Sequence, residues 1–283
     1  MKYLSNSSEN SATPVLRIPK DTQVSETLFY QDATHQALTI VLEPNSSANI
    51  IDETVAGEKS VRSIHVQKGA KLHYTHIQRC GEDVTFVEEQ MAEVDQDAIF
   101  QTVHIGLGAR QMTSNIHTKL MQPGAQAKIL GVFFGHNHQV FEAHTIQDHE
   151  APNTQSDLLF KSALKDESQS HYEGVIRIPR QAQKSDAFQT NRNLLLSEKA
   201  KAKSIPKLEI IADDVRCKHA AAMGTLNAEE LFYLQSRGLD GAQAERMVVE
   251  GFFEEVLSQI PSDEVRQRLV KNVHERLLEG KLG

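Results

Sequence analysis

The chain has 283 residues, of which 39% are hydrophobic and 24% charged, and its formal net charge is −8. These values are typical of a soluble globular protein that is large enough for one sizeable core and a smaller second unit. The acidic balance and the lack of a Lys- and Arg-rich run argue against a nucleic-acid partner, and no apolar stretch approaches the ~20 residues of a membrane span.

The N-terminus and the cysteine content indicate a cytoplasmic protein. Residues 1–13 are polar, and we expect them to be a disordered N-terminus. The run at 6–10 has no apolar core, which argues against a signal peptide. The chain has two cysteines, Cys80 and Cys217. So few cysteines fit a reducing compartment better than a secreted protein.

The segment from about Val15 to Cys217 is dominated by an apolar pattern of period two. Alternation of this kind predicts half-buried strands, with one set of side chains inside and the other outside. The clearest alternating residues are Leu38, Ile40, Leu42, Ile64, Val66, Val84, Phe86, Ile99, Val103, Ile105, Leu208 and Ile210.

Short polar turns separate these predicted strands. They lie at 44–49, 68–71, 123–126, 180–184 and 197–201. Many short strands divided in this way predict a sandwich, a barrel or a solenoid, and loose repetition at steps of about 15–27 residues favours a right-handed β-helix. Periodicity alone leaves the sandwich open. We therefore predict a β-helix core over residues 14–224.

A small helical domain is predicted over residues 225–283. Two pairs have the spacing of capping boxes, namely Asn227 with Glu230 and Asp240 with Gln243. Pro261 stops the helix that begins after Asp240, and a third helix follows it.

The second predicted helix, over 241–260, has an unusually wide apolar face. Its apolar residues sweep about 180°, whereas a surface helix needs a stripe of only ~100°. They are Val248, Val249, Phe252, Phe253, Val256, Leu257 and Ile260. The excess face is covered either by neighbouring helices or by a partner, and the sequence leaves both open.

Three segments resemble the SufB/SufD family, the paired scaffold subunits of the SUF iron–sulfur cluster assembly system. They are APNTQSDLLFKSAL (151–164), SDAFQTNRNLLLSEKA (185–200) and ADDVRCKHAAAMGTLNAEELFYLQSRGL (212–239). The resemblance runs from about residue 15 to about residue 260. The Cys217-Lys218-His219 step is most similar to SufD.

The resemblance implies a β-helix core with a C-terminal helical domain, in a scaffold subunit that is not an enzyme. It also implies two partners: a SufB-like subunit that pairs through the β-helix, and the ABC-type ATPase SufC, which docks on the C-terminal helices. We expect the ATPase contact at Val249, Phe252, Phe253 and Val256. A SufD-like protein that pairs with itself remains the alternative.

This chain departs from the family pattern in two places. Many members have a long helical region before the β-helix, whereas this sequence begins almost directly at its first strand. In addition, Ala220 and Ala221 follow His219 where the family pattern leads us to expect Gly-Ala. A partner set that differs from the usual one is therefore an open alternative.

Cys217 and His219 are the candidate metal ligands. At i and i+2 on a strand they face the same side, and thiolate and imidazole are ligands used in iron–sulfur chemistry. On spacing alone, a buried packing cysteine beside a solvent-facing histidine is the simpler interpretation. The resemblance implies that His219 lies at the subunit interface, facing a SufB cysteine. There, a transient iron–sulfur cluster would form, with no tightly bound cofactor.

Other chemistry-bearing residues give weaker signals. His136 and His138, with His144, Asp148 and His149 nearby, resemble a metal site, but thirteen histidines on a β-rich chain produce such groups by chance. Cys80 is interpreted as a packing residue.

No sequence motif of an enzyme stands out. The glycines at 106 and 108 lack the setting of a phosphate loop, and no Gly-x-Ser-x-Gly elbow occurs. The rival function is a β-helix carbohydrate-active enzyme that uses carboxylates such as Asp213 and Asp214. The aromatic content of 6% argues against a sugar groove.

Overall fold

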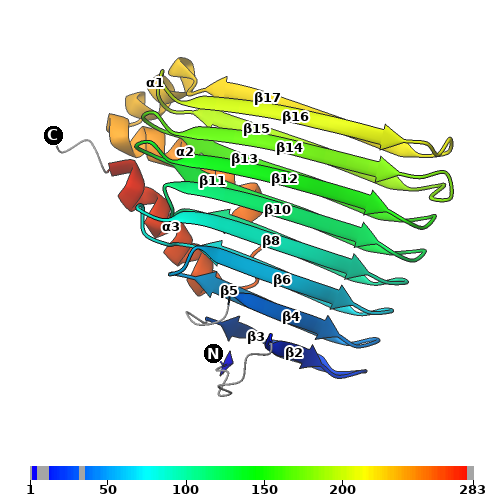
Figure 1. The fold of residues 1–283 in the computed structure, drawn as a ribbon. Helices are drawn as coiled ribbons and strands as arrows, with labels where there is room; N and C mark the ends of the chain where they lie inside the picture. The colour runs from blue at the N-terminus through cyan, green and yellow to red at the C-terminus, as the bar shows by residue number, and fades with distance from the viewer. Residues whose placement is uncertain (1, 5–12, 32–35, 279–283) are drawn as a thin grey trace.

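The computed structural model describes residues 2–4, 13–31 and 36–278. Strands that alternate between two sheets fill most of this length, and three helices follow them. Figure 1 shows the strands stacked one above another, with the helical unit lying along one side of the stack.

The two sheets divide the strands by their order in the chain. Sheet A holds β1 (Lys2–Leu4), β3 (Gln23–Tyr30), β5 (Ser47–Thr54), β7 (Lys71–Gln78), β9 (Ile99–Gly106), β11 (Gln126–Gly135), β13 (Gln155–Leu164), β15 (Asp186–Leu195) and β17 (Arg216–Thr225). Sheet B holds β2 (Val15–Ile18), β4 (Ala37–Leu42), β6 (Lys59–Val66), β8 (Thr85–Val94), β10 (Gln111–Leu120), β12 (Val140–His149), β14 (Gln169–Ile178) and β16 (Lys201–Ile210). Each strand pairs in parallel with the next strand but one, so the chain winds between the sheets as a β-solenoid. The predicted β-helix core is confirmed.

Alternating side chains build the interior of the solenoid. Along β6 and β8 every second residue is buried, including Ile64, Val66 and Phe86. The buried set points between the two sheets and the other set points outward, as period-two patterning requires. This arrangement explains why apolar alternation was visible in the sequence over so long a stretch.

The corners of the solenoid need residues that accept a left-handed backbone. Asn45 (φ 59°), Gly69 (φ 66°), Asp97 (φ 55°) and Gly124 (φ 80°) occupy equivalent corners of successive coils. Their N–H groups donate to carbonyls of the following corner, as from Asn45 to Lys68 (2.9 Å) and from Gly69 to Gln96 (2.9 Å). Asn, Asp and Gly tolerate this conformation best, which is why the predicted polar turns at 44–49, 68–71 and 123–126 are corners.

The N-terminal expectation is corrected in part. Lys2–Leu4 form β1, which pairs in parallel with β3 through Lys2 and Leu28. The predicted disorder of residues 1–13 therefore does not hold for these three residues. Residues 1 and 5–12 lie outside the described part of the chain.

Three helices follow β17: α1 (Ala228–Ser236), α2 (Gly241–Leu257) and α3 (Asp263–Leu278). The capping box of α2 is present, because Gln243 N–H donates to Asp240 Oδ1 (2.8 Å) and Asp240 N–H donates to Gln243 Oε1 (2.9 Å). Asn227 caps α1 by accepting from Glu229 N–H (2.9 Å). No helix within residues 228–278 has the length and apolar character needed to cross a bilayer.

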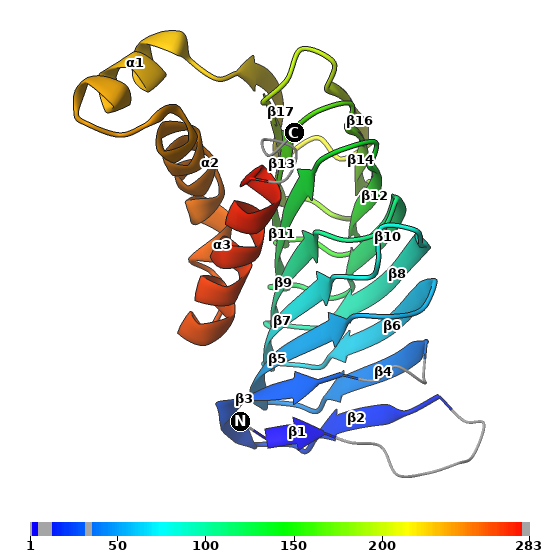
Figure 2. The same ribbon diagram turned by 90° about the vertical axis from the view of Figure 1, so that its left-hand side faces the viewer.

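Helices α2 and α3 pack on the outer face of sheet A, whereas α1 stands at the far end of the helical unit (Figure 2). One apolar cluster joins the two helices to the sheet. Its members include Leu130, Val132, Phe134, Leu159, Val249, Phe253, Val256, Leu257, Leu269 and Val273. Since β11 and β13 are covered on both faces, long parts of them are buried without alternation.

Candidate functional site

The last strand of sheet A carries both predicted metal ligands. Cys217 pairs with Ala187 of β15, and His219 pairs with Gln189. Ala187 and Gln189 are buried, and Cys217 packs with Ala187 against a small apolar cluster inside the last coil. Because side chains two residues apart share a face, Cys217 and His219 both face the interior side of the solenoid wall.

This position lies at the open end of the solenoid. β17 ends the strand order of sheet A and β16 ends that of sheet B, so each has a described neighbour on one side only. Cys217 is half-buried, and His219 with all the residues after it in β17 is exposed. The two side chains therefore line the mouth of the solenoid rather than its closed interior.

The Cys217 thiol is not activated by its own surroundings. Burial raises the pKa of Cys217 above its ordinary value, although a backbone hydrogen bond from Ala187 acts in the opposite direction. A thiolate is the form that binds metal, so binding at Cys217 needs an incoming cation or partner that favours deprotonation.

Exposed apolar side chains surround the same end. Leu208 on β16 is 41% exposed, Ile211 just after it is 61% exposed, and Met223 on β17 is 53% exposed. Long exposed edge strands with apolar side chains are templates for pairing with another chain. Among the described residues, the open end therefore combines strand edges without a pairing partner, exposed apolar side chains and two side chains of metal-ligand type.

The predicted docking face on α2 is corrected. Val249, Phe253 and Val256 are 0%, 1% and 0% exposed, because sheet A and α3 cover them. Phe252 is half-buried, with the Lys161 ammonium 5.1 Å from its ring centroid. The wide apolar face of α2 is satisfied within the chain, so these side chains are not open to a partner in this arrangement.

Helix α1 is the part of the helical unit that remains uncovered. None of its residues is buried, and its two neighbouring aromatic residues, Phe232 and Tyr233, are 71% and 56% exposed. Met247, on α2, is 54% exposed. Exposed apolar side chains of the helical unit are therefore found on α1 as the adjacent pair Phe232 and Tyr233. Phe232 and Tyr233 lie in the segment 212–239 that carries the resemblance, but nothing else in the sequence marked them as exposed.

The histidine-rich segment near residue 140 does not form a single site. His138 is exposed at a corner and His144 is exposed on the outer face of sheet B. His149 lies inside the solenoid, where burial lowers its pKa to about 4, and it contacts the hydroxyls of Thr154 (2.7 Å) and Ser156 (2.8 Å). His149 is therefore neutral at pH 7, and its role is in packing and hydrogen bonding.

One group of residues was missed in the sequence analysis. In the described part of the chain, three side chains of metal-binding type lie close enough together to hold one ion. They are His76, Glu88 and His104. All three are inside the solenoid. The alternating pattern of the sequence places all three residues at inward positions. The sequence does not show the register between strands, so it does not show that these three meet.

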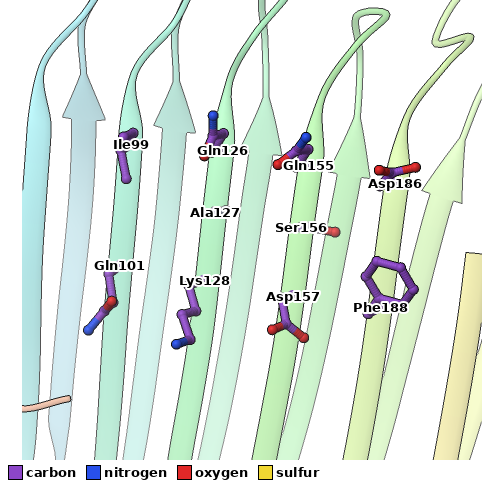
Figure 3. A pocket seen from close by; sticks show the side chains of 10 residues that line it. All are labelled: Ile99, Gln101, Gln126, Ala127, Lys128, Gln155, Ser156, Asp157, Asp186 and Phe188. Atoms are coloured by element: carbon purple, nitrogen blue, oxygen red, sulfur yellow. The ribbon is translucent and has the colours of Figure 1, made fainter. Parts of the chain in front are cut away.

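A pocket of about 390 Å³ lies on the outer face of sheet A (Figure 3). Lys128 of β11 pairs with Asp157 of β13 in its wall, and burial raises the pKa of Asp157. Lys128 Nζ donates to Gln259 Oε1 (3.1 Å), and Phe188 supplies the aromatic side chain of the lining. The lining has two carboxylates, Asp157 and Asp186, but Arg216 Nε donates to Asp186 Oδ1 (2.7 Å), so they are not the pair of unengaged carboxylates that a sugar-cleaving groove uses.

Comparison with known proteins points to one family. A family model described as "SUF system FeS cluster assembly, SufBD core domain" matches residues 24–252. An iron–sulfur cluster assembly SufBD family protein of Mycobacterium bovis is 31% identical over 96% of this chain and 72% of its own length. The chloroplastic protein ABCI7 of Arabidopsis thaliana is 29% identical over 83% of this chain and 51% of its own length. A SufBD family protein of Synechocystis is 29% identical over 74% of this chain and 46% of its own length.

Proposed function

Because the chain belongs to the SufBD family of iron–sulfur cluster assembly proteins, we propose that it is a non-catalytic scaffold subunit of that machinery. In this proposal the open end of the solenoid pairs with a second SufBD-type subunit, and the helical unit binds an ABC-type ATPase. The observation that carries it is the exposed mouth formed by β16 and β17, where Cys217 and His219 lie.

The open end suits pairing by strand addition. β17 offers ten residues of strand whose outer edge has no described partner, and β16 ends sheet B in the same way. A partner strand would satisfy the backbone groups on these edges, and side chains at the mouth would set the register. Met223 and Leu208 provide apolar contact area on the two sheets.

Cluster chemistry at this junction requires ligands from both subunits. Cys217 and His219 provide one sulfur and one nitrogen donor on the same face of β17. Two ligands do not make a stable iron–sulfur site, which normally has four. A site that holds its cluster weakly in this way releases it readily to a recipient protein, as a scaffold requires.

The free thiols fit the cytoplasm, which we propose as the location. Both cysteines are unpaired, and Cys80 is buried. Burial raises the pKa of Cys80, so it remains a protonated packing residue. A disulfide-forming compartment would offer no advantage to such a chain.

Changing His219 to Ala is expected to abolish cluster delivery while leaving the chain folded. The side chain is exposed, so the free energy of unfolding should change by no more than about 0.5 kcal/mol. Cluster formation should fall sharply, because a junction with few ligands cannot lose one. The measurement is complementation of a strain that depends on this protein, with the complex isolated to confirm its assembly.

His171 provides a matched control for this experiment. It is also exposed on a strand, but lies on β14 and on the outer face of sheet B. His171→Ala should support normal delivery. If an intact complex containing His219→Ala delivers clusters normally, His219 is not part of the site. If the chain is isolated only as a homodimer, its pairing partner is a second copy of the same chain.

Replacing Phe232 and Tyr233 with Asp is expected to abolish binding of the ATPase without unfolding the helical unit. Both side chains are mostly exposed in the free chain, but two carboxylates placed in an apolar interface would lose their hydration. Isothermal titration of the isolated ATPase with wild-type and doubly substituted chains measures the effect. Glu229→Gln, also exposed on α1, is the control, and equal affinities for all three chains would place the contact elsewhere.

A further inference from the structure

Three buried side chains meet inside the solenoid, away from its open end. His76 on β7 and His104 on β9 are direct neighbours in sheet A, and Glu88 reaches them from β8 in the opposite sheet. Their exposed fractions are 1%, 0% and 1%. Three ionisable groups with almost no contact with water need a strong compensating interaction, because burial of charge is costly.

The geometry brings their donor atoms to one point. His76 Nδ1 lies 2.6 Å and His104 Nδ1 lies 2.7 Å from the same oxygen, Glu88 Oε1. The three candidate ligand atoms are all within 4.8 Å of one another. Ser114 Oγ donates to the other carboxylate oxygen, Glu88 Oε2, at 2.8 Å. The hydrogen bond from Ser114 therefore fixes the carboxylate through Oε2, while Oε1 faces both imidazole rings.

The outer nitrogens of the two rings are held by hydroxyl groups. His76 Nε2 lies 3.1 Å from Thr54 Oγ1, and His104 Nε2 lies 3.0 Å from Thr102 Oγ1. Thr102 donates its single hydroxyl proton to Gln90 Oε1 (3.2 Å), so it accepts from His104 Nε2. A proton on Nε2 leaves His104 Nδ1 free for a second proton or for a metal ion, and a histidine that binds metal through Nδ1 needs this tautomer.

The charge balance at this point favours a cation between the three groups. A buried carboxylate needs a compensating positive charge, and Nδ1 of both rings lies within hydrogen-bond distance of its Oε1. A bare nitrogen facing a carboxylate oxygen at 2.7 Å is repulsive, so either protons or a metal ion occupy the space.

We propose that His76, Glu88 and His104 form a binding site for one divalent first-row transition metal ion. Two imidazoles and one carboxylate form a donor set used for Zn²⁺ and for Fe²⁺. Ligand atoms around a tetrahedral zinc are about 3.3 Å apart, so the carboxylate would retreat by less than about 1 Å on binding. A water molecule would complete the coordination. Thr54, Thr102 and Ser114 orient the ligands.

Aromatic rings close the site on two sides. Phe86 stacks on His76 with centroids 6.4 Å apart, and Phe160 stacks on His104 at 6.3 Å. With the three ligands almost fully buried, an ion cannot enter the folded chain by a simple encounter. The metal would be taken up while the coils containing β7, β8 and β9 assemble, and it would then exchange slowly. This site is separate from the proposed cluster junction at His219.

The test is refolding of the full chain in the presence of metal. Wild-type protein unfolded in denaturant with chelator and refolded with Co²⁺ should retain about one equivalent per chain, with the visible absorption of low-coordinate Co²⁺ bound by nitrogen and oxygen. Native protein mixed with Co²⁺ for the same time should retain far less. Refolding without metal, followed by Co²⁺, provides the reference for slow uptake.

Variants separate this site from adventitious binding. Glu88→Gln should lose the retained Co²⁺, and Thr102→Val, which removes only a supporting hydroxyl, should weaken affinity roughly 10–100-fold. His65→Gln is the matched control, because His65 Nδ1 also meets a carboxylate, Glu93 Oε2 at 3.1 Å, but in an exposed pair. If Glu88→Gln fails to fold, the Co²⁺ spectrum of the wild-type chain and the Co²⁺ affinity of Thr102→Val still test the site. A wild-type chain that refolds without retaining Co²⁺, or equal Co²⁺ affinities of wild type and Thr102→Val when both refold in competition with a chelator, would overturn the proposal.

Discussion

Changing Asp52 to Ala is expected to lower the free energy of unfolding by about 3–5 kcal/mol, among the largest effects for a single substitution in this chain. Asp52 and Arg62 are 1% and 3% exposed inside the solenoid. Arg62 Nε donates to Asp52 Oδ2 (2.5 Å), and Tyr74 Oη donates to the same oxygen (2.6 Å). Loss of the carboxylate leaves the guanidinium buried without a counter-charge, and removes the acceptor for the Tyr74 hydroxyl.

The electrostatics of this pair support a large effect. Burial alone would lower the pKa of Arg62, but the Asp52 carboxylate outweighs it and raises the pKa above its ordinary value. Arg62 therefore remains charged in the Asp52→Ala variant, and its desolvation is uncompensated. The full desolvation cost of the Arg62 charge should therefore appear in the free energy of unfolding, because the guanidinium does not lose its proton.

Urea unfolding at pH 7 measures this prediction. Asp52→Ala, Arg62→Ala and the double variant form a cycle, and the double variant should be less destabilised than the sum of the two single ones. Glu43→Ala is the control, since its pair with Arg17 (2.8 Å) lies on the surface and should contribute little. If Asp52→Ala resembled Glu43→Ala, the buried pair would not be formed in solution.

Much of the fold could be predicted because local chemistry repeats along the solenoid. Ile64 and Val66 alternate with outward residues on β6, and a polar corner containing Gly69 follows directly. Each strand and its corner carry this information within a few residues. Parallel stacking then propagates the same local arrangement from coil to coil. A small number of local rules is therefore enough to define the core.

The interior polar groups could not be predicted in the same way. His76, Glu88 and His104 lie on three separate strands, and only the register of β7 with β9 makes the two histidines neighbours. A shift by one residue would turn every side chain of a strand to the other face. The sequence shows where inward positions are, but not which inward residues of different coils meet.

The role of α2 was misassigned for a related reason. The wide apolar face of α2 was correctly recognised. It packs against the outer face of sheet A, where the apolar residues of β11 and β13 look in the sequence like those of any buried strand. A strand buried on both faces and a strand buried on one face differ only in the outward residues. The match between this sheet face and α2 therefore required the three-dimensional arrangement.

Changing Phe253 to Ala tests this corrected role of α2, and is expected to destabilise the isolated chain by about 3–5 kcal/mol. Phe253 is 1% exposed and belongs to the cluster that contains Phe134 and Val132 of β11. Truncation would leave a cavity between the helix and the sheet, because neither element can close it without moving its backbone. The effect should be present without any partner, since the lost contacts are within the chain.

Far-UV circular dichroism during urea unfolding follows the loss of helix in this experiment. Phe232→Ala is the matched control, because this residue is 71% exposed on α1 and should change stability by no more than about 0.5 kcal/mol. If α2 can detach from the sheet, helical signal in the Phe253→Ala chain should be lost at lower urea than the β-sheet signal. Equal stabilities for the two variants would mean that the face of α2 is open in the free chain, and it would then return as the candidate contact for the ATPase in place of α1.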